Sequence, residues 1–466
     1  MSTAFAPVGN HAQFDLIVLG SGLGGSLAAM IARQRGLSVA ICDPTPHPRF
    51  AIGESFTPAA SMALAAIADE FDLPELAPLA SYGSWMAESP ELMRGRKRGF
   101  VYVNGTGDPQ PVVAVASSSD EVADVNAVRA DLDRFLLASA VRRGVRLVAA
   151  NPIAQAYRDG TWRLVFERSE PIRGRLLLVS NALPRGLDDV RPIASPFAYR
   201  SRLTYTHLAD TQPNVLSDLI KAESPGFRFP FDPIWSAHHV LLEGGWRWNL
   251  PFDDGRCSIG LEVDSDDRSL PELRDEWLNA AENDDAIARP PGRWLELDSP
   301  QRCCNAAGGE ALALLPHAFG FVTPLHSTGL MSTIAAAPIA VDALLAGDTE
   351  PLTKRYRDLL DTVDRLAVLA QLTRTRPRAF EAAVCHYLAA AIAGETTFDR
   401  TRPLLLSHDP AYRQQLDEAI TRAGAIASKA DEDAFFAWSG DRLRAFCPVP
   451  LCDDAARRCY TATAAR

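Results

Sequence analysis

The sequence predicts an α/β fold: a Rossmann-like nucleotide-binding domain, a second mostly antiparallel sheet domain and a helical C-terminal region. Three observations predict it. A β-favouring run at residues 14–19 leads into a glycine-rich turn and then an alanine-rich helical stretch. Alternating and aromatic runs fill the middle of the chain. Helical patterns follow residue 350.

The composition is that of a globular protein. The chain has 466 residues, which at about 150 residues per domain allows roughly two or three domains. Hydrophobic residues make up 47% and charged residues 23%, which excludes a disordered or fibrous chain. The formal net charge is -11, so the chain lacks the net positive charge that would favour binding to nucleic acid or to an anionic membrane.

Compartment signals point to the cytoplasm. No apolar run is expected to span a bilayer. Residues 1–13 lack the basic flank and apolar stretch of a signal peptide. The eight cysteines include no C-x-x-C spacing, so we expect reduced thiols, with neither a disulfide scaffold nor a metal site.

The first motif has the context of a dinucleotide-binding turn. Residues 20–25 read GSGLGG and follow the predicted strand at 14–19. A predicted helix at 26–35 comes next, and then a second predicted strand at 37–42. This order of strand, turn, helix and strand is the one that a dinucleotide fingerprint requires.

Each residue of this motif has an expected task. Gly20 permits the tight turn, and Gly22 lets the backbone approach a pyrophosphate at the helix start. Gly25 permits close packing of the helix on the strand. Asp43, at the tip of the second strand, is placed to accept hydrogen bonds from a ribose. A glycine-rich turn without a nucleotide is the alternative.

Two further segments extend the pattern. Glu54 and Ser55 belong to a Gly-Glu-Ser loop before an alanine-rich helix that Thr57 is expected to cap. Arg129 opens another expected helix, where it would meet a phosphate or the adenosine half of a cofactor. The alternatives are an ordinary loop and a surface arginine.

Together these pieces resemble the flavin-dependent halogenases (the tryptophan halogenase-like family) and their FAD monooxygenase relatives. The glycine motif, the Gly-Glu-Ser loop and Arg129 match the general FAD pattern. Residues 245–251, GWRWNLP, are similar to the family's W-x-W-x-I-P motif, with Leu250 in place of Ile. Residues 324–329, PLHSTG, are similar to its P-L-E-S-T-G segment. The resemblance covers roughly residues 14–350 and implies an FAD-binding domain of the aromatic hydroxylase and halogenase type.

The resemblance also implies an activity. Reduced FAD, a cosubstrate, forms a C4a-hydroperoxide with oxygen, and chloride or bromide attacks it to give hypohalous acid. That acid halogenates a small electron-rich aromatic substrate of secondary metabolism, free or tethered to a carrier. No second glycine fingerprint is visible, which favours a separate flavin reductase as the source of reduced FAD. The alternatives are a monooxygenase or oxidase on the same fold and a flavoprotein that binds without turnover.

The two family motifs imply specific roles. Trp246 and Trp248 stand two residues apart and so face one side of a strand. In the family such a pair forms a wall between flavin and substrate, and two core aromatics are the alternative. Thr328 and Gly329 precede an apolar helical stretch. In the family this segment binds halide beside the flavin ring, where Gly329 also meets the cofactor, and an ordinary capped helix is the alternative.

Two histidines mark departures from the family. His326 stands where the tryptophan-acting members have Glu. It is expected to act as an acid, a base or a hydrogen-bond donor near neutral pH. His317 occupies the place of an Asp that in related FAD enzymes holds the ribityl chain. Either His317 replaces that Asp or FAD binds loosely.

The family depends on a lysine that delivers the halogen, and Lys97 is the candidate here. Residues 81–83 read SYG, so the S-Y-K pattern of the tryptophan-acting members is absent. Lys97 stands two residues before a glycine and a predicted strand, which fits the phenol- and pyrrole-acting pattern. Arg94, Arg96 and Arg98 are expected to lower its pKa and favour a nucleophilic amine. A solvated basic turn or a phosphate-binding cluster is the alternative.

The predicted domains are discontinuous. Residues 12–60, 120–190 and 305–350 are expected to form the FAD-binding domain. Residues 61–119 and 191–304 would form the substrate-side sheet domain. In the helical region at 351–466 we expect helices at 356–373, 409–422 and 431–444, with breaks at Pro377 and Gly394.

Overall fold

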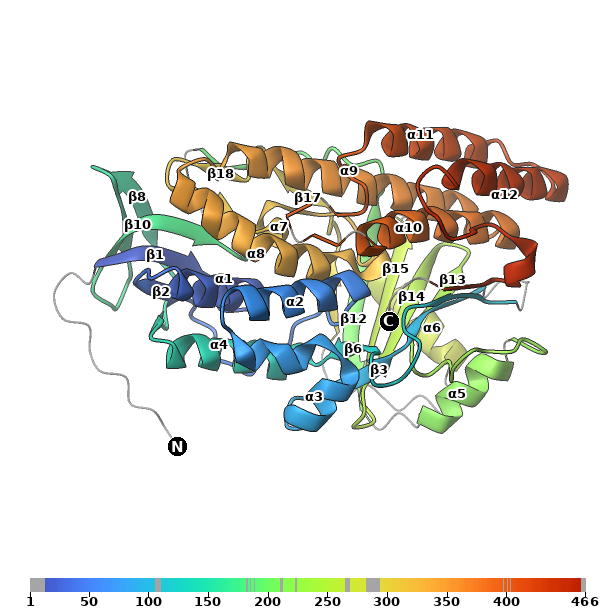
Figure 1. Ribbon diagram of the computed structural model, residues 1–466, viewed down its shortest axis with the longest axis horizontal. Helices are drawn as coiled ribbons and strands as arrows, with labels where there is room; N and C mark the ends of the chain where they lie inside the picture. The colour runs from blue at the N-terminus through green and yellow to red at the C-terminus, as the bar shows by residue number, and fades with distance from the viewer. Residues whose placement is uncertain are drawn as a thin grey trace.

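The computed structural model contains two 8-stranded sheets, a 3-stranded sheet and a 2-stranded sheet. In Figure 1 the first large sheet lies at the left and the second right of centre, with helices packed along both. The structure describes residues 13–104, 110–181, 183–184, 186–187, 189–209, 213–222, 224–264, 269–281, 294–396, 398–399, 401–402 and 404–461.

The first sheet is built around parallel strands. Its strands come from all three segments expected to form the FAD-binding domain, although the domain boundaries themselves stay a prediction. The parallel strands run in the order β19 (Leu312–Leu314), β10 (Ile172–Val179), β1 (Gln13–Leu19), β2 (Val39–Cys42) and β7 (Arg146–Val148). The antiparallel strands β18 (Gly308–Gly309), β8 (Ala154–Arg158) and β9 (Thr161–Val165) complete it.

Three long helices pack close to the start of this sheet. Helix α1 (Leu23–Gln34) packs against both α4 (Arg129–Arg142) and α8 (Thr328–Ala346). It is buried along most of its length, which explains its run of small and aliphatic residues. Helix α2 (Pro58–Glu70) follows, and the Thr57 side chain accepts from the Ala60 backbone N–H, so the predicted cap is confirmed.

The second large sheet is mostly antiparallel, as predicted. Strand β14 lies inside it, so the Trp246–Trp248 segment is hydrogen-bonded to a neighbouring strand along both edges. The order is β16 (Leu295–Leu297), β12 (Ser201–Leu208), β15 (Cys257–Asp264), β14 (Gly245–Pro251), β13 (Ala237–Leu242), β4 (Gly99–Asn104), β5 (Val112–Val115) and β21 (Cys459–Thr461). Only the β13–β4 and β5–β21 pairs of this described order are parallel.

Short elements connect the two large sheets. Strand β3 (Arg94–Lys97) pairs with β6 (Asp124–Ala127) and places Lys97 opposite Asp124. The 3-stranded sheet consists of β11 (Pro192–Ile193), β17 (Arg302–Cys304) and β20 (Gly320–Phe321). The other helices outside the C-terminal region are η1 (Pro74–Ala80), α3 (Tyr82–Glu88), α5 (Pro213–Ala222), α6 (Leu270–Ala281), α7 (Pro316–Phe319) and η2 (Leu325–Ser327), and η3 (Asp454–Ala456) lies near the C-terminus.

The C-terminal region is helical, as predicted, but one helix was not foreseen. Helices α9 (Glu350–Thr373), α11 (Pro410–Gly424) and α12 (Lys429–Leu443) fall where the sequence predicts them. Helix α10 (Pro377–Thr396) begins at one expected break and runs through the other, Gly394. Packing of α10 against α9 and α12 outweighs the low helix propensity of one glycine.

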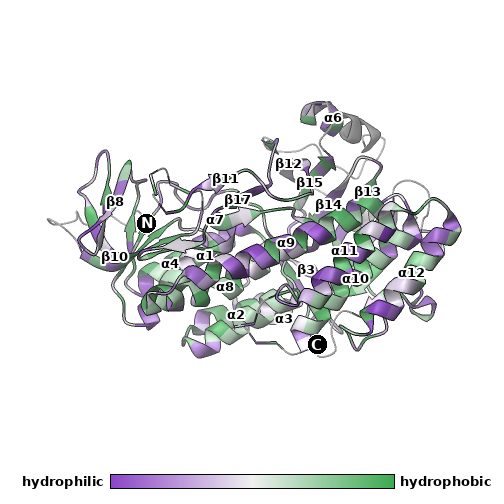
Figure 2. Cartoon of the chain, turned by 90° about the horizontal axis from the view of Figure 1, so that it is seen from above, coloured by the Kyte–Doolittle hydropathy of each residue, from purple (hydrophilic) through white to green (hydrophobic). Residues whose placement is uncertain are grey.

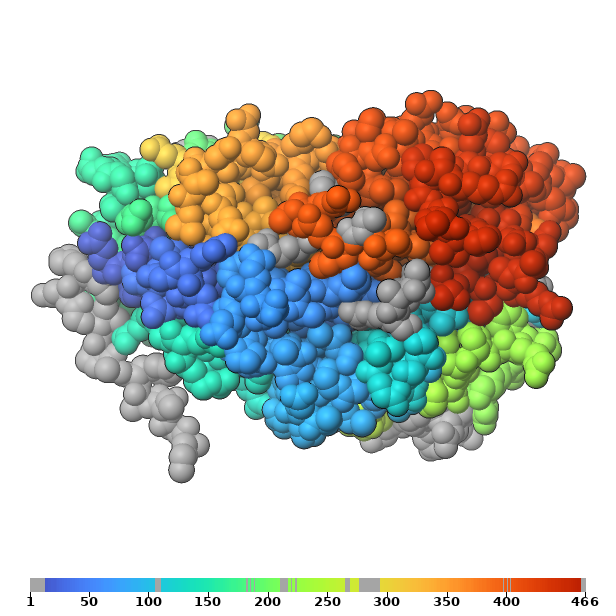
Figure 3. Space-filling view, in the orientation of Figure 1, coloured from blue at the N-terminus to red at the C-terminus, as the bar shows by residue number. Residues whose placement is uncertain are grey.

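These helices cover one end of the molecule. In Figure 3 the C-terminal chain, coloured red, forms the upper right of the surface. Figure 2 shows hydrophilic residues alternating with hydrophobic ones along α9, as expected of a helix with one exposed face. One cluster of buried apolar residues contains members of both large sheets and of α9 to α12.

Helix α8 corrects one expectation from the sequence. Residues Leu325–Ala346 are long and apolar enough to cross a membrane by length and composition, so the expected absence of such a run is wrong. In this fold, however, 61% of the most apolar stretch is buried inside the protein. Helix α8 packs against α1 and α2, and a helix enclosed in this way needs apolar residues on several faces.

Candidate active site

The glycine-rich turn brings α1 very close to β1. Gly20 has a positive φ of 103°, a conformation that favours glycine. A Cβ on Gly25 would lie 2.0 Å from the Gly20 carbonyl oxygen. Both positions therefore require glycine for the strand, the turn and the helix to meet, which is the packing predicted for them.

Gly22, in contrast, leaves room for a Cβ at ordinary contact distances. A Cβ there would meet no heavy atom nearer than the Asp133 Oδ2, at 3.4 Å. Gly22 lines a cavity of about 550 Å³, which lies within the usual size range of ligand pockets. We call this space the first cavity.

The first cavity gathers most of the predicted site residues. They come from widely separated parts of the chain, and the fold brings them around one space. Its walls include Gly22, Glu54, Ser55, Arg129, Trp246, Trp248, His317 and Gly329. Gly20, Gly25, Asp43 and Thr328 lie outside the lining, as do Lys97 and His326.

The Gly-Glu-Ser loop is fastened to α4 by Arg129. The guanidinium contacts both Asp133 carboxylate oxygens, at 2.9 and 3.0 Å, and donates to the carbonyls of Ile52 and Gly53. Glu54 lies 2.7 Å from the His207 imidazole. The Ser55 hydroxyl is buried and has no hydrogen-bond partner among the described residues, so it is a polar group that a ligand would satisfy.

Asp43 has protein partners on both carboxylate oxygens. Arg49 contacts the two oxygens at 2.8 and 2.9 Å, and Ser21 donates through its backbone and its hydroxyl. Burial acts to raise the pKa of Asp43, but these hydrogen bonds outweigh it and lower the pKa to about 2. A ribose would therefore have to displace Arg49 in order to reach this carboxylate. The sequence did not predict the contact between Arg49 and Asp43.

The two tryptophans lie side by side, as their spacing predicts. Their ring centroids are 5.7 Å apart, and both line the first cavity. Gly260 stands opposite Trp248 on β15, and a Cβ at Gly260 would lie 2.0 Å from the Trp248 ring. This glycine therefore makes the room in which the Trp248 indole lies.

We expect Gly260→Ala to displace the Trp248 indole, because the added methyl overlaps a rigid ring. Intrinsic tryptophan fluorescence should shift, and the melting temperature should fall by several degrees, as expected for overpacking that costs about 1–3 kcal/mol. Gly244→Ala is the matched control, since a Cβ there meets nothing within 4 Å. An unchanged emission spectrum in Gly260→Ala would contradict this packing.

His326 lies in a strained turn before α8. His326 has φ 65° and Ser327 has φ 56°, and two consecutive non-glycine residues in the left-handed region are costly. The His326 Nδ1 lies 3.0 Å from the Tyr102 hydroxyl, and its ring stacks on Tyr387 with centroids 4.2 Å apart. Burial, and then the nearby His239, lower the pKa of His326 to about 3. The His326 ring is therefore uncharged at neutral pH. A hydrogen-bonding role fits such a ring better than the expected role as an acid or a base.

Four aromatic side chains form a continuous series of ring contacts, some stacked and some edge to face, that begins at Trp246. His239 lies 5.0 Å from Trp246 and also 5.0 Å from Tyr102, centroid to centroid. Tyr102 contacts His326, which stacks on Tyr387. We call His239, Tyr102, His326 and Tyr387 the ring layer. His239 lines the first cavity, whereas Tyr387 lines another, so the ring layer separates two spaces.

The other space, the second cavity, has a volume of about 140 Å³. It lies between the start of α2 and the C-terminal helices. Its walls include Thr57, Met331, Tyr387, Glu395, Phe398 and Leu405. The walls therefore combine apolar side chains with charged and polar ones, among them Asp399, Arg402 and His408.

Lys97 is fully buried beside the ring layer. Its ammonium donates to the Phe56 carbonyl, next to Thr57 of the second cavity, and lies 3.9 Å from the Phe100 centroid. Burial lowers the pKa of Lys97 to about 8, against the opposing effect of Asp124 and Glu395.

The expected cause of this shift was wrong. Arg96 and Arg98 are paired with Asp120 at 2.6 and 2.9 Å, and Arg94 lies 3.8 Å from Asp253. The arginines are therefore neutralised elsewhere, and desolvation lowers the lysine pKa instead. Gly105, which follows strand β4 at the far end from Lys97, lies outside the described residues.

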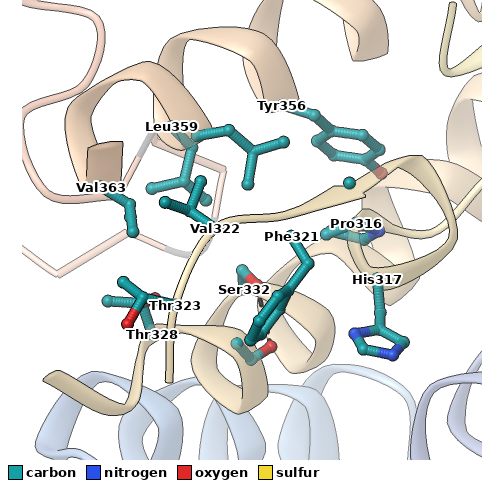
Figure 4. Close-up of a pocket in the computed structure, with 13 residues that line it drawn as sticks. Pro316, His317, Phe321, Val322, Thr323, Thr328, Ser332, Tyr356, Leu359 and Val363 are labelled. Carbon is teal, nitrogen blue, oxygen red and sulfur yellow. Dashed lines mark hydrogen bonds between the residues drawn. The ribbon is translucent and has the colours of Figure 1, made fainter. Parts of the chain in front are cut away.

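A third, small cavity of about 30 Å³ lies behind the Ser-Thr-Gly turn. In Figure 4 residues Tyr356, Leu359 and Val363 of α9 lie on one side, and Thr328 and Ser332 of α8 lie on the other. The predicted Thr328 therefore borders this cavity, whereas Gly329 borders both it and the first cavity.

His317 has its own partner. Its Nε2 lies 3.0 Å from an Arg302 guanidinium nitrogen, and Arg302 also donates to the His317 carbonyl. His317 lines the first cavity together with Arg302. Where related FAD enzymes have an Asp, this protein therefore has His317 with Arg302 beside it.

Several residues of the site were not foreseen. Tyr102 and Phe100 alternate on β4 and share a face, a pattern visible in the sequence. Tyr387 lies on α10, which was expected to be interrupted. Glu262 accepts hydrogen bonds from Trp246, and no local motif marks it.

Comparisons with known proteins point to one group of enzymes. No known family profile matches the chain. The chain is 29% identical over 388 residues to monodechloroaminopyrrolnitrin halogenase PrnC of Pseudomonas fluorescens, covering 75% of this chain and 65% of that protein. It is 27% identical over 354 residues to tetracycline 7-halogenase of Kitasatospora aureofaciens, covering 69% and 61%.

The resemblance to the flavin-dependent halogenases is confirmed. The chain spans less than two thirds of the length of either curated relative. Among solved structures, halogenase PltM in complex with phloroglucinol and FAD has a TM-score of 0.84 at 20% identity, covering 97% of this chain and 99% of that one.

Other structures share the fold at greater distance. The myxobacterial chondrochloren halogenase CndH has a TM-score of 0.59 at 20% identity, over 90% of this chain and 99% of that chain. A flavoprotein/dehydrogenase from Cytophaga hutchinsonii has a TM-score of 0.64 at 16% identity, over 88% and 99%. The predicted fold is therefore confirmed, as that of FAD-binding halogenases.

Proposed function

We propose that this protein is an FAD-dependent halogenase that acts on a small electron-rich aromatic substrate. One observation carries the proposal. The first cavity gathers the glycine motif, the paired tryptophans and Gly329, and the ring layer separates it from the second cavity, beside which Lys97 is buried. Such an arrangement suits an oxidant that is made on one side and used on the other.

The residues of the first cavity fit FAD. Gly22, at the start of α1, leaves the room that a pyrophosphate needs there. Asp43 would hold the ribose once Arg49 moves aside, and the Ser55 hydroxyl would gain a partner. The flavin ring would lie against Trp246 and near Gly329. When bound, reduced FAD would supply the two electrons that convert dioxygen and halide into hypohalous acid and water.

The start of α8 is suited to hold the halide. The first backbone N–H groups of a helix have no partner within the helix, and they favour an anion. Thr328 and Gly329 are the first two residues of α8, and Gly329 borders the first cavity. Chloride or bromide at their N–H groups would lie beside the flavin ring.

Lys97 would deliver the halogen. A primary amine with a pKa of about 8 is partly unprotonated near neutral pH, so it can react with hypohalous acid or hydrogen-bond to it. Asp124 and Glu395 would stabilise the ammonium that remains. Glu395 also borders the second cavity, where the aromatic substrate would lie.

The substrate class follows from the relatives and from the second cavity. Phloroglucinol lies with FAD in one structural relative, and the walls of the second cavity include apolar side chains such as Met331, Phe398 and Leu405 that would contact an aromatic ring. We propose a phenol or pyrrole, free or carrier-tethered. A separate flavin reductase and a cytoplasmic location complete this proposal.

A monooxygenase or oxidase on the same fold is the second candidate. His326 in place of the family's Glu favours it, and the same fold also occurs in a flavoprotein/dehydrogenase. Under this alternative Lys97 would stabilise the fold through its bond to the Phe56 carbonyl and would take no part in the reaction.

Product masses distinguish the two candidates. The purified protein would be incubated with chemically reduced FAD, oxygen and bromide, against a panel of phenols, indoles and pyrroles. We expect products that carry the isotope doublet of one bromine. Products that gain only oxygen, with bromide present, would establish the oxygenase alternative.

A further inference from the structure

Glu262 on β15 lies in the middle of a dense set of hydrogen bonds. Its Oε2 accepts from the Trp246 indole N–H at 2.8 Å and from the Thr323 hydroxyl at 2.7 Å. Its Oε1 accepts from the Ser201 hydroxyl at 2.5 Å, and the Tyr199 hydroxyl also hydrogen-bonds to the carboxyl group. An ionised carboxylate, which only accepts, matches a set of donors in this way.

These partners belong to two different segments: Trp246 lines the first cavity, and Thr323 lies just before Pro324, which lines it as well. Trp246 stands opposite Glu262 in the β14–β15 pairing and forms part of the tryptophan pair. Thr323 begins the turn that leads to His326 and α8, and its hydroxyl oxygen accepts from the Leu325 backbone N–H at 3.1 Å. One carboxylate thus connects the tryptophan pair with the turn that sets the start of α8.

A second contact strengthens the same connection. Gln301 donates to the Ser201 hydroxyl at 2.7 Å and to the Val322 carbonyl at 2.9 Å. The turn before α8 is therefore held at Val322 and at Thr323 by groups that converge on Glu262. Val322 and Thr323 also border the small cavity behind that turn, as Figure 4 shows.

Packing alone does not explain a carboxylate at this place. Glu262 is fully buried, and no lysine or arginine forms an ion pair with it within the described part of the chain. Burial raises its pKa to about 7, although the hydrogen bonds from Ser201, Thr323, Trp246 and Tyr199 act in the opposite direction. A buried acid without a cation is costly, and an apolar side chain of similar volume would fill the space at lower cost.

We propose that Glu262 is a positioning residue that fixes the Trp246 indole and the Thr323–Leu325 turn in one geometry around the first cavity. This inference rests on the proposed function, because it assumes that the flavin ring occupies that cavity. Without the carboxylate, the indole and the helix start move independently. Lys97 and the second cavity remain as they are, since none of the partners of Glu262 borders them.

The test compares Glu262→Gln with wild type in FAD titrations followed by flavin fluorescence. Glutamine keeps the size of the side chain and one acceptor oxygen, but its NH2 group cannot accept a hydrogen bond. We expect FAD affinity to fall by about tenfold, the size of one lost charge-assisted hydrogen bond. Glu262→Met, which has no acceptor oxygen, should bind FAD more weakly still.

A matched control separates positioning from general loss of a buried acid. Glu381 is also buried and accepts from Tyr460 at 2.6 Å; unlike Glu262 it also pairs with Arg378 and Arg458, and it borders neither large cavity. Glu381→Gln should lower the melting temperature yet bind FAD as wild type does. Equal FAD affinities in Glu262→Gln and wild type would overturn the inference. Failure of wild type itself to bind FAD would overturn the proposed function instead.

A double-mutant cycle keeps the inference testable if Glu262→Gln does not fold. Trp246→Phe and Thr323→Val each remove one donor to the same carboxylate oxygen. Because both act through Glu262, we expect their combined effect on FAD affinity to differ from the sum of the single effects. Additive effects would mean that the two walls are independent, which contradicts the inference.

Discussion

Lys97→Met should abolish halogen transfer to the substrate and leave FAD binding at the wild-type level. The amine is buried beside the ring layer, with its carbonyl acceptor next to the second cavity. Lys97 itself does not line the first cavity. Methionine fills much of the same space without an amine, so the variant tests the nucleophile and not the packing. Product formation would be measured by mass spectrometry, and FAD binding by fluorescence.

A matched control lies one residue away. Arg96 precedes Lys97 on the same strand, so its side chain points to the opposite face, where it pairs with Asp120 and stacks over Trp235. Arg96→Met should therefore retain halogenation. Lys97→Arg should fail as Lys97→Met does, because a guanidinium is not a nucleophile near neutral pH. Wild-type halogenation by Lys97→Met would show that the lysine takes no part.

Gly22→Val should lower FAD affinity by at least about two orders of magnitude, or ~3 kcal/mol. The branched side chain would occupy the space in which the pyrophosphate meets the start of α1. The protein itself should still fold, because a Cβ at Gly22 approaches no heavy atom closer than 3.4 Å. Fluorescence titration with FAD measures the loss, and circular dichroism checks the fold.

Gly244→Val provides the comparison for this prediction. Gly244 lies at the turn between β13 and β14, and a Cβ there meets nothing within 4 Å. It should bind FAD as tightly as wild type. If Gly22→Val also kept wild-type affinity, the pyrophosphate would not lie at the glycine motif.

Local sequence patterns were enough to predict most of the fold. The glycine turn was predictable because strand, turn, helix and acidic residue follow one another within 30 residues of the motif's start, roughly one βαβ unit. The tryptophan pair was predictable because strand periodicity alone places Trp246 and Trp248 on one side. Both features depend on neighbours in the sequence.

The ring layer could not be predicted in the same way. It takes His239 from β13, Tyr102 from β4, His326 from a strained turn and Tyr387 from α10. Nothing in the sequence states that these elements meet. The signals at Pro377 and Gly394 also argued against a continuous α10, although tertiary packing holds it together.

Electrostatics was the other part that the sequence left open. The arginines around Lys97 were visible, but their partners Asp120 and Asp253 were not. Likewise Asp43 was visible, but the two contacts from Arg49 were not. Charge in a motif does not reveal which neighbour neutralises it, because that depends on side-chain direction in the folded chain.

The central claim is that halide and flavin meet in the first cavity. Crystals grown with FAD and soaked in bromide, with diffraction recorded at the bromine absorption edge, test it most directly. We expect the flavin ring against Trp246 and Trp248, with an anomalous peak at the backbone N–H groups of Thr328 and Gly329. Flavin in that cavity with no anomalous peak beside it, in crystals that show bromide elsewhere, would contradict the account.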